Sequence, residues 1–469
     1  MSVLNTFAEK EAIRAAFSRK EKVFFVGIGG IQMHALAILL SRMGYAVGGS
    51  DRIESEATGR LRAAGIPVQI GHREENIAGY GTLIYTLAVE DDTPELRAAR
   101  RAGIPCFSRA DLLGYLMSLY PTRIAVAGMH GKSTTTAMLA AILQKADKDP
   151  TVISGAALNT DGEVFRVGGR EIMLVEACEY KDSFLCLDPT VAVVLNAELE
   201  HTDYFHSEAE VCRSFSAFLA RARVAILPAE RQSVALLPNP NSAVVRFGQE
   251  EGAAVRALNV TYINGCPAFD VVLRGVIRGR IHLAVPGEHN LQNALAACAA
   301  ADACGIPFAT MRAALADFAG TPRRLQQRGN RQGYVIYEDY AHHPTEIRAS
   351  LAALRRILPK NKGEKPRLIC LYQPHTYSRT AAFFCDFADA LSAADHVILL
   401  DIYAAREQNE SGVSSAALAA AIPGAVYASD MPTALALLRD LCRTGDTLAV
   451  MGAGDIHDRF PFDQIETEM

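Results

Sequence analysis

A glycine-rich turn between a buried strand and a helix constrains the fold of this 469-residue chain more than any other feature. The segment 123–127, Arg-Ile-Ala-Val-Ala, has the pattern of a buried strand, the next residues read Gly-Met-His-Gly-Lys-Ser-Thr, and the pattern over 132–145 predicts the helix. Backbone N–H groups of such a turn bind phosphate oxygens, with Lys132 reaching the terminal phosphates and the Ser133 hydroxyl binding Mg²⁺. The first glycine of the full P-loop pattern falls on Val126. A plain strand–helix turn is therefore the alternative.

Short runs rich in Val and Ile alternate with helical patterns along most of the chain, which predicts an α/β protein with parallel strands. Between 244 and 285 the pattern changes to short strands bounded by Asn264-Gly265 and Arg278-Gly279, which predicts a β meander. The other expected strands span 23–28, 46–49, 67–70, 82–85, 104–107, 123–127, 172–176, 191–196, 335–338, 368–372, 397–400 and 448–451. The expected helices span 33–43, 94–101, 132–145, 207–221, 291–304, 344–358, 380–393 and 432–442.

Length and composition bound the organisation of the chain. At about 150 residues per domain the length suits three domains, and we place their boundaries at 1–121, 122–321 and 322–469. A hydrophobic content of 50% with 21% charged residues is typical of globular proteins. The charged segment 360–365 is expected to be a linker or loop.

Charge and cysteine usage limit the partners and the compartment. The net charge of −5 comes without a basic block, which argues against a nucleic-acid partner. No apolar run approaches the length of about 20 residues that a membrane span needs, and charges near the start disfavour a signal peptide. The 10 cysteines are scattered without a CxxC pair, as expected for buried thiols of a reducing compartment. We therefore expect a cytoplasmic protein with no membrane partner.

A second glycine turn follows the first predicted strand. The segment 27–32 reads Gly-Ile-Gly-Gly-Ile-Gln and resembles the dinucleotide-binding fingerprint, with Gln32 in place of its third glycine. Asp51 stands at the end of the next strand, where an acid that binds a ribose is expected. The turn predicts a site for a nucleotide diphosphate and argues against a nicotinamide cofactor.

Acidic residues and histidines follow the strands of the middle region. Glu176 ends one predicted strand, Glu179 comes shortly after it, and Glu200-His201 follows the next strand. Parallel strands bring their carboxyl ends to one edge of a sheet, which is also the edge of the phosphate loop. A carboxylate and an imidazole there would hold Mg²⁺ beside a triphosphate. Each residue taken alone has the alternative of being a solvated loop group.

Three further clusters of hydrogen-bonding residues lie at strand ends or helix starts. They read Gly-Glu-His-Asn-Leu-Gln-Asn at 287–293, Asp-Tyr-Ala-His-His-Pro at 339–344 and Gln-Pro-His-Thr-Tyr-Ser-Arg-Thr at 373–380. The pair His342-His343 also has a plain structural interpretation, because a residue before Pro344 is well placed to cap a helix.

Taken together and in this order, the motifs resemble those of the Mur ligase family of peptidoglycan synthesis, from about Lys22 to Ile456. The resemblance implies a Rossmann-like UDP-sugar domain, a central P-loop ATPase domain with a small β meander, and a Rossmann-like C-terminal domain that closes over the site. The segments 27–30, 339–346 and 401–407 are most similar to the alanine-adding branch. The absence of lysine between Lys181 and Lys360 also fits that branch.

The resemblance implies an ATP-dependent ligase with ATP and Mg²⁺ as cofactors. It would join L-alanine to the lactyl carboxylate of UDP-N-acetylmuramate through an acyl phosphate, as a monomer or homodimer. One alternative is a murein-recycling ligase that adds a tripeptide to the same UDP-sugar. An alternative of another class is a nucleotide-binding regulator without enzymatic activity on the same fold.

The resemblance also assigns roles to individual residues. The residues expected to act in catalysis are Lys132, Glu176, His201 and Arg379. Those expected to bind ATP are Gly128, His130, Gly131, Lys132, Ser133, Thr134, His289, Asn290, Asn293, Arg323, Arg324 and Asp339. Those expected to bind Mg²⁺ are Ser133, Glu176 and His201. Those expected to bind UDP-sugar or amino acid are Gly29, Gly30, Asp51, His72, Tyr340, His342, His375 and Arg379.

Several positions depart from the family pattern. Met129 stands in place of the usual Thr of the phosphate loop, and Cys178 stands where many relatives have Asp. Gln32 and His34 replace the usual Gly and Ser after the first glycines, and Thr376 replaces an Arg found in some members. Arg379 is therefore the expected partner of the amino-acid carboxylate.

Overall fold

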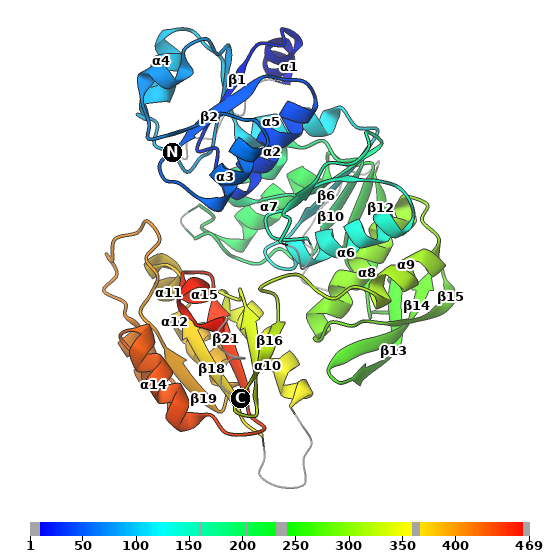
Figure 1. Ribbon diagram of the computed structural model, residues 1–469. Helices are drawn as coiled ribbons and strands as arrows, with labels where there is room; N and C mark the ends of the chain where they lie inside the picture. The colour runs from blue at the N-terminus through cyan, green and yellow to red at the C-terminus, as the bar shows by residue number, and fades with distance from the viewer. Residues whose placement is uncertain (1–9, 159–161, 203, 231–241, 359–365, 463–469) are drawn as a thin grey trace. The chain divides into compact units, whose positions relative to one another are not determined.

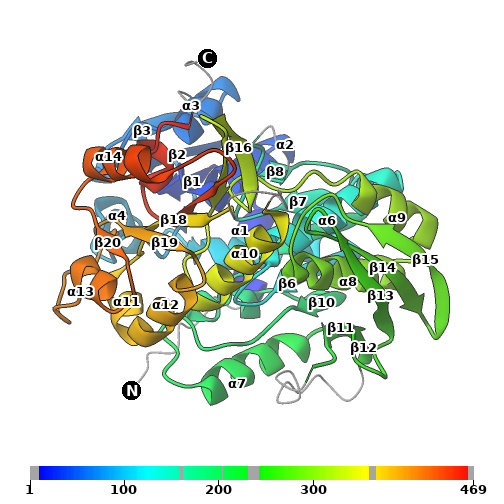
Figure 2. The ribbon, with the colours of Figure 1, turned by 90° about the horizontal axis from the view of Figure 1, so that it is seen from below.

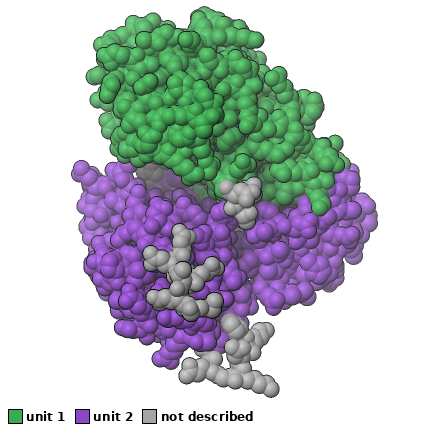
Figure 3. Space-filling model, in the orientation of Figure 1, with its two compact units in different colours: residues 1–197, 212–246, 299–306 green, residues 198–211, 247–298, 307–469 purple. Residues whose placement is uncertain are grey.

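The computed structural model (Figure 1, Figure 2) describes residues 10–158, 162–202, 204–230, 242–358 and 366–462. The chain forms two compact units, coloured separately in Figure 3. The first contains residues 1–197, 212–246 and 299–306, and the second contains residues 198–211, 247–298 and 307–469. Within the described residues no helix combines the length and apolar composition of a membrane span. The predicted segment 360–365 lies outside the described residues.

A five-stranded parallel sheet with the order β3-β2-β1-β4-β5 opens the first unit. Its strands are β1 (Val23–Val26), β2 (Val47–Asp51), β3 (Val68–Ile70), β4 (Thr82–Tyr85) and β5 (Cys106–Ser108). Its helices are α1 (Lys10–Ser18), α2 (Ile31–Arg42), α3 (Glu56–Ala63), η1 (Glu74–Ile77), α4 (Pro94–Arg101) and α5 (Arg109–Ser118). Capping boxes start α3 at Ser55 and α5 at Ser108. All five strands predicted in this region are confirmed, with shifted ends in every strand except β4.

The second sheet of this unit carries the phosphate loop. It is part of a ten-stranded sheet, and the strands of this unit have the order β11-β10-β6-β9-β7-β8, parallel except for the β7–β8 pair. Its elements are β6 (Thr122–Ala127), α6 (Lys132–Lys145), β7 (Thr151–Ile153), β8 (Phe165–Arg166), β9 (Ile172–Glu176), η2 (Tyr180–Cys186), β10 (Val191–Val194), α7 (Glu208–Leu219, from Cys212 onward) and β11 (Val224–Pro228). Strand β6 lies between β9 and β10. The loop after β6 therefore meets the carboxyl ends of both neighbours.

Strands of the second unit form the expected meander only in part. The elements here are β12 (Ala243–Gly248, from Phe247 onward), β13 (Val255–Ile263), β14 (Cys266–Leu273), β15 (Val276–His282), α8 (Glu288–Ala303, up to Cys298) and α9 (Phe308–Ala316). Strands β13, β14 and β15 are antiparallel, whereas β12 pairs in parallel with β13. The turn at Asn264-Gly265 is confirmed, with φ of 49° and 75°.

The turn predicted at Arg278-Gly279 is wrong, because both residues lie inside β15. The turn is instead formed by Arg274-Gly275, with φ of 53° and 77°. Gly279 has a φ of 141° and lies where the β14–β15 register shifts between Val271 and Val272. The glycine thus marks a β-bulge, which is the other common use of glycine in a strand.

The C-terminal sheet of this unit has the order β16-β17-β21-β18-β19-β20, parallel except for the β16–β17 pair. Its strands are β16 (Gln326–Arg331), β17 (Tyr334–Asp339), β18 (Leu368–Gln373), β19 (His396–Leu399), β20 (Val426–Tyr427) and β21 (Thr447–Gly452). Its helices are α10 (Pro344–Ile357), α11 (Tyr377–Ala382), α12 (Phe384–Leu391), α13 (Ser415–Ala420), α14 (Met431–Leu441) and α15 (Ile456–Arg459).

The two faces of this sheet are covered by different helices. One apolar core contains side chains of α10, α12 and α13, and the other contains side chains of α14 and α15. The single helix expected over 380–393 is two helices, because Phe383 leaves the helical conformation at φ −115° and ψ 28°. The predicted α/β class, with three sheets, is confirmed.

Candidate functional site

The phosphate loop joins β6 to α6 through two glycines in the left-handed region. Gly131 precedes α6 with φ 80°, and Gly128 has φ 142°. A Cβ on Gly128 would lie 3.0 Å from Leu195 Cβ. The Asn196 side chain accepts from the His130 N–H at 3.0 Å and donates to the His130 carbonyl at 3.1 Å. Sequence reasoning missed Asn196, which it treated as the end of a strand.

Lys132 lies over this loop. Its ammonium group donates to the carbonyl oxygens of Gly128 at 2.5 Å and Met129 at 3.1 Å. It also lies 3.1 Å from each carboxylate oxygen of Glu179, whose side chain is 2% exposed. A phosphate bound by the loop would meet an ammonium group that the loop already orients.

Several hydrogen-bond donors converge on the Glu176 carboxylate beside the phosphate loop. Its Oε2 accepts from Ser133 Oγ at 3.0 Å, Ser154 Oγ at 3.1 Å and the Gly155 N–H at 2.8 Å. Three donors on one oxygen fix the orientation of this carboxylate. An anionic carboxylate beside a hydroxyl is a hard-oxygen pair that fits Mg²⁺. The sequence pattern missed Ser154 and Gly155, whose one signal is their position just after β7.

His201, the third predicted metal ligand, belongs to the second unit. Its φ of 52° is left-handed, and its carbonyl accepts from the N–H groups of Tyr204 at 2.7 Å and Phe205 at 2.9 Å. The local turn thus holds the backbone of His201 in a defined conformation. Its role toward a metal stays a prediction.

The predicted UDP-binding residues gather at the carboxyl edge of the first sheet. Asp51 Oδ2 accepts from the Gly29 N–H at 2.8 Å, and a Cβ on Gly29 would lie 2.9 Å from the same oxygen. Gly30 precedes α2 directly. His72 Nδ1 lies 3.2 Å from the buried Glu95 and 3.3 Å from Ser50 Oγ. The structure therefore joins Asp51 to the glycine turn.

The two unusual residues of this region are held by protein contacts. Gln32 accepts a hydrogen bond from Arg109. His34 Nδ1 lies 3.1 Å from the Gly30 carbonyl, and burial lowers the pKa of this histidine. Both side chains thus have structural contacts where the family pattern has Gly and Ser.

The predicted amino-acid residues of the second unit form one cluster. Arg379 Nη2 lies 3.1 Å from Glu200 Oε1, and Arg379 Nη1 lies 3.1 Å from His375 Nδ1. His342 Nε2 lies 3.6 Å from the same Glu200 oxygen, and the ring of Tyr340 packs edge-on against His342 at 5.4 Å. Burial and then the Arg379 charge lower the pKa of His375 to about 4. Glu200 enters this cluster although the sequence suggested a role beside Mg²⁺.

The sequence suggested either helix capping or substrate binding for the pair His342-His343, and the two residues differ in this respect. His343 caps α10, because its Nδ1 accepts from the Thr345 N–H at 3.3 Å while Glu346 completes a capping box. His342 belongs to the cluster around Glu200. The capping alternative is therefore confirmed for His343.

Three predicted nucleotide-binding residues belong to the C-terminal sheet region. Two of them, Arg323 and Arg324, pack against Tyr340, and the third, Asp339, is buried. The guanidinium groups of Arg323 and Arg324 lie 4.8 and 5.1 Å from the Tyr340 ring centroid. Asp339 accepts from Ser350 Oγ at 2.6 Å and from the Ala341 N–H at 3.0 Å, and burial raises its pKa. Both Asp339 oxygens are thus engaged within the protein.

The start of α8 holds the remaining predicted nucleotide residues. Asn290 Nδ2 donates to the Pro286 carbonyl at 2.7 Å, and Asn293 Nδ2 donates to Asn290 Oδ1 at 3.2 Å. A Cβ on Gly287, whose φ is 100°, would lie 2.5 Å from the His289 ring, so this position requires glycine. Burial lowers the pKa of His289 to about 4. His289 is consequently a neutral imidazole near pH 7.

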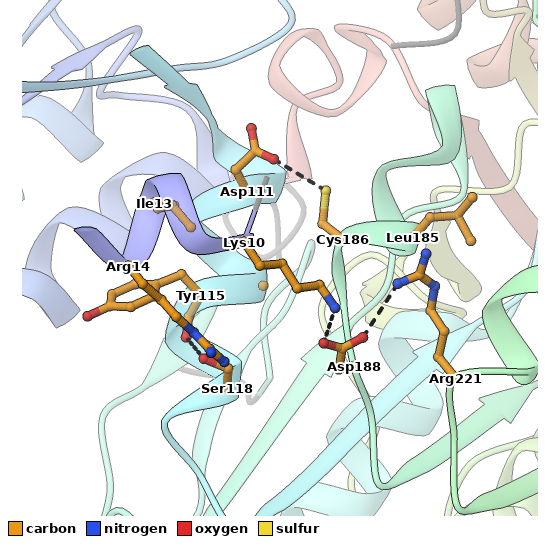
Figure 4. A pocket seen from close by; sticks show the side chains of 11 residues that line it. Lys10, Ile13, Arg14, Asp111, Tyr115, Ser118, Leu185, Cys186, Asp188 and Arg221 are labelled. Atoms are coloured by element: carbon orange, nitrogen blue, oxygen red, sulfur yellow. Dashed lines mark hydrogen bonds and ion pairs between the residues drawn. The ribbon is translucent and has the colours of Figure 1, made fainter. Parts of the chain in front are cut away.

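A separate cavity of about 160 Å³ in the first unit contains none of the predicted site residues. Figure 4 shows Lys10 and Arg221 pointing toward Asp188, with which both form ion pairs. Cys186 Sγ lies 3.7 Å from Asp111 Oδ1, and burial followed by this carboxylate raises the pKa of the thiol. None of the 10 cysteines, all of which lie in the described part of the chain, forms a disulfide bond.

Comparisons with known proteins agree with these motifs. Three family models match in order: the Mur ligase family catalytic domain at residues 22–121, the Mur ligase middle domain at 126–301, and the Mur ligase glutamate ligase domain at 323–454. The UDP-N-acetylmuramate–L-alanine ligase of Caldicellulosiruptor bescii is 40% identical, covering 93% of this chain and 96% of that protein. The ligase of the same name from Agathobacter rectalis is also 40% identical, with coverages of 94% and 97%.

Solved structures show the same relationship. The UDP-N-acetylmuramate-alanine ligase of Thermotoga maritima superimposes with a TM-score of 0.77 at 27% identity, covering 94% of this chain and 97% of that one. A murein peptide ligase from Psychrobacter arcticus shares the fold with a TM-score of 0.67 at 22% identity, with coverages of 94% and 98%. The family models, the relatives and the three-sheet architecture lead to one conclusion: this chain belongs to the Mur ligase family.

Proposed function

We propose that this protein joins L-alanine to the lactyl carboxylate of UDP-N-acetylmuramate at the expense of ATP, releasing ADP and phosphate in peptidoglycan precursor synthesis. The observation that carries the proposal is the phosphate loop, in which Lys132 and the Ser133–Glu176 pair share one edge of the sheet. Relatives 38–41% identical over more than nine-tenths of the chain, all named as L-alanine ligases, support the choice of amino acid.

The reaction needs ATP because a carboxylate is a poor electrophile at neutral pH. Phosphoryl transfer to the lactyl carboxylate gives an acyl phosphate, which the amine of alanine attacks to form the amide and release phosphate. Such a transfer depends on positioning and charge neutralisation. Lys132 supplies a cation fixed by the carbonyl oxygens of Gly128 and Met129. The loop N–H groups supply further donors at the start of α6.

Magnesium fits the donor set of this edge. Ser133 and Glu176 would hold the ion together with His201, and the bound ion would reduce repulsion between triphosphate and carboxylate. Ser154 and Gly155 orient Glu176 through its Oε2. These contacts hold this oxygen beside the Ser133 hydroxyl.

We propose that each remaining predicted residue binds one part of a substrate. Gly29, Gly30, Asp51 and His72 would bind the UDP moiety, and His289, Asn290 and Asn293 would bind the adenine side of ATP. Tyr340, His342, His375 and Arg379 would shape the amino-acid pocket, where the planar guanidinium of Arg379 suits a carboxylate. We further propose domain boundaries near residues 121 and 321 and a cytoplasmic location.

A phosphate-release assay tests the proposed function against its alternative. ATP and UDP-N-acetylmuramate are incubated with the protein and either L-alanine or the murein tripeptide. Phosphate release that requires L-alanine supports the proposal. Release with the tripeptide alone indicates the recycling activity, and the absence of release with both amino components contradicts a ligase function.

A further inference from the structure

The buried carboxylate of Glu200 lies directly beside the arginine of the proposed amino-acid pocket. Glu200 is 3% exposed, and its Oε1 lies 3.1 Å from Arg379 Nη2 and 3.6 Å from His342 Nε2. A carboxylate at this depth is retained as an anion when cations or hydrogen-bond donors face it. The cluster thus presents a negative and a positive group next to each other.

The neighbouring histidines orient this pair. Arg379 Nη1 donates to His375 Nδ1 at 3.1 Å, so this ring carries its proton on Nε2. His342 Nδ1 lies 3.0 Å from the Tyr340 carbonyl, which only accepts, so His342 donates from Nδ1. Nδ1 thus accepts in His375, which contacts Arg379, and donates in His342, whose Nε2 lies 3.6 Å from Glu200 Oε1.

The spacing of the pair matches that of an α-amino acid. Standard bond lengths place the ammonium nitrogen and the nearer carboxylate oxygen of alanine about 3 Å apart. Glu200 Oε1 and Arg379 Nη2 are separated by 3.1 Å. A zwitterion lying antiparallel to the pair would place its ammonium on Glu200 and its carboxylate on Arg379, without breaking the ion pair.

We propose that Glu200 binds the α-ammonium group of the amino-acid substrate while Arg379 binds its carboxylate. Glu200 is then a specificity-determining residue of the amino-acid pocket. This inference rests on the proposed ligase function and deepens it. It accounts for a buried acidic residue that neither the phosphate loop nor the Ser133–Glu176 pair employs.

Substrate analogues that lack one charge test the proposal. L-lactate keeps the carboxylate and replaces the ammonium with a hydroxyl, whereas L-alaninamide keeps the ammonium and lacks the carboxylate. The KM for L-alanine, the inhibition constant of L-lactate and the half-saturating concentration of L-alaninamide are measured by phosphate release or its inhibition. The wild type, Glu200→Gln, Glu200→Asp and Arg379→Met are compared, with unfolding midpoints as the control for folding.

We expect each substitution to weaken binding of L-alanine and to spare the analogue that lacks the charge which the replaced residue would bind. Glu200→Gln raises the KM for L-alanine by about 10-fold to 100-fold, the range of a lost charged hydrogen bond, and leaves the L-lactate constant within about threefold. Arg379→Met raises the KM for L-alanine and leaves L-alaninamide within the same limit. Glu200→Asp restores most of the alanine affinity, because the charge returns.

Two results would overturn the proposal. An equal rise of the L-alanine KM and the L-lactate constant in Glu200→Gln would show that Glu200 only supports Arg379. An unchanged KM for L-alanine in a folded Glu200→Gln protein would remove Glu200 from the pocket. A wild type without alanine-dependent phosphate release would instead contradict the proposed function itself, so the two failures are distinguishable.

Discussion

The ammonium group of Lys132 lies 3.1 Å from both carboxylate oxygens of Glu179, and both side chains are largely buried. The pair keeps the charge of the phosphate-loop lysine compensated inside the protein. Removing one partner of such a pair leaves an uncompensated buried charge, which typically costs 3–5 kcal/mol of stability. Function and stability are therefore coupled at Lys132, and a test of its role has to separate them.

We expect Lys132→Met to lower alanine-dependent ADP release by at least about 100-fold to 1,000-fold, because a fixed donor to the transferred phosphate is lost. The same change is expected to lower the free energy of unfolding, since Glu179 loses its cation. The double variant Lys132→Met/Glu179→Gln should recover the stability and stay inactive. Activity of the double variant near that of the wild type would contradict the assignment of Lys132 to phosphate binding.

Magnesium dependence checks the role of Glu176. Replacing this carboxylate by an amide in Glu176→Gln keeps its shape and removes the charge beside Ser133. We expect the Mg²⁺ concentration for half-maximal phosphate release to rise by at least about 10-fold. Ser154→Ala is the matched control, because it removes one donor at 3.1 Å from Glu176 and leaves the carboxylate in place. Equal effects of both changes would argue for a structural role alone.

The half-buried His289 predicts a pH dependence of stability. Its folded pKa of about 4 lies below the ordinary value of 6.5, so the unfolded chain binds more protons between pH 6.5 and 4. Stability therefore falls as the pH falls through this window, by about 1 to 3 kcal/mol for one such histidine. We expect His289→Gln to reduce this loss in denaturant unfolding at pH 7, 6 and 5. The exposed His282→Gln is the control, and equal pH slopes in the two variants would contradict the prediction.

A pair of glycines tests the packing of α5 against η2. A Cβ on Gly114 would lie 2.3 Å from the Cys186 carbonyl oxygen, whereas a Cβ on Gly59 of α3 meets nothing within 4 Å. Gly114→Ala is expected to destabilise the protein by about 1 to 3 kcal/mol through overpacking. Gly59→Ala should stabilise it by about 0.5 to 1 kcal/mol through helix propensity. Thermal unfolding of both variants checks the opposite signs.

Local patterns predicted the regular elements where they were long and clearly bounded. Strand β4 and helices α4 and α6 match the predicted ranges residue for residue, because apolar runs, Pro94 and the phosphate-loop glycines mark their ends. Strands β7, β8, β11, β16 and β20 were not predicted, and of these β8 and β20 have only two residues, which is too short to show a periodicity. The turn at Arg278-Gly279 failed because glycine serves bulges as well as turns.

The sequence predicted the separate motifs of the candidate site. It predicted only some of the contacts between residues of different motifs. The phosphate loop suggests Lys132 and Ser133 by local spacing alone. Glu200 and Arg379 are 179 positions apart in the chain, so their contact follows from the fold and not from a local pattern. Ser154 and Gly155 likewise contact Glu176 only because β7 pairs with β9.

The most direct test of the central claim follows an oxygen atom. If ATP phosphorylates the lactyl carboxylate, then UDP-N-acetylmuramate labelled with ¹⁸O in that carboxylate must transfer label to the phosphate released with L-alanine. We predict phosphate that carries one ¹⁸O per turnover, together with the amide product of L-alanine, both read by mass spectrometry. Unlabelled phosphate, or phosphate released without the amide product, would contradict the account.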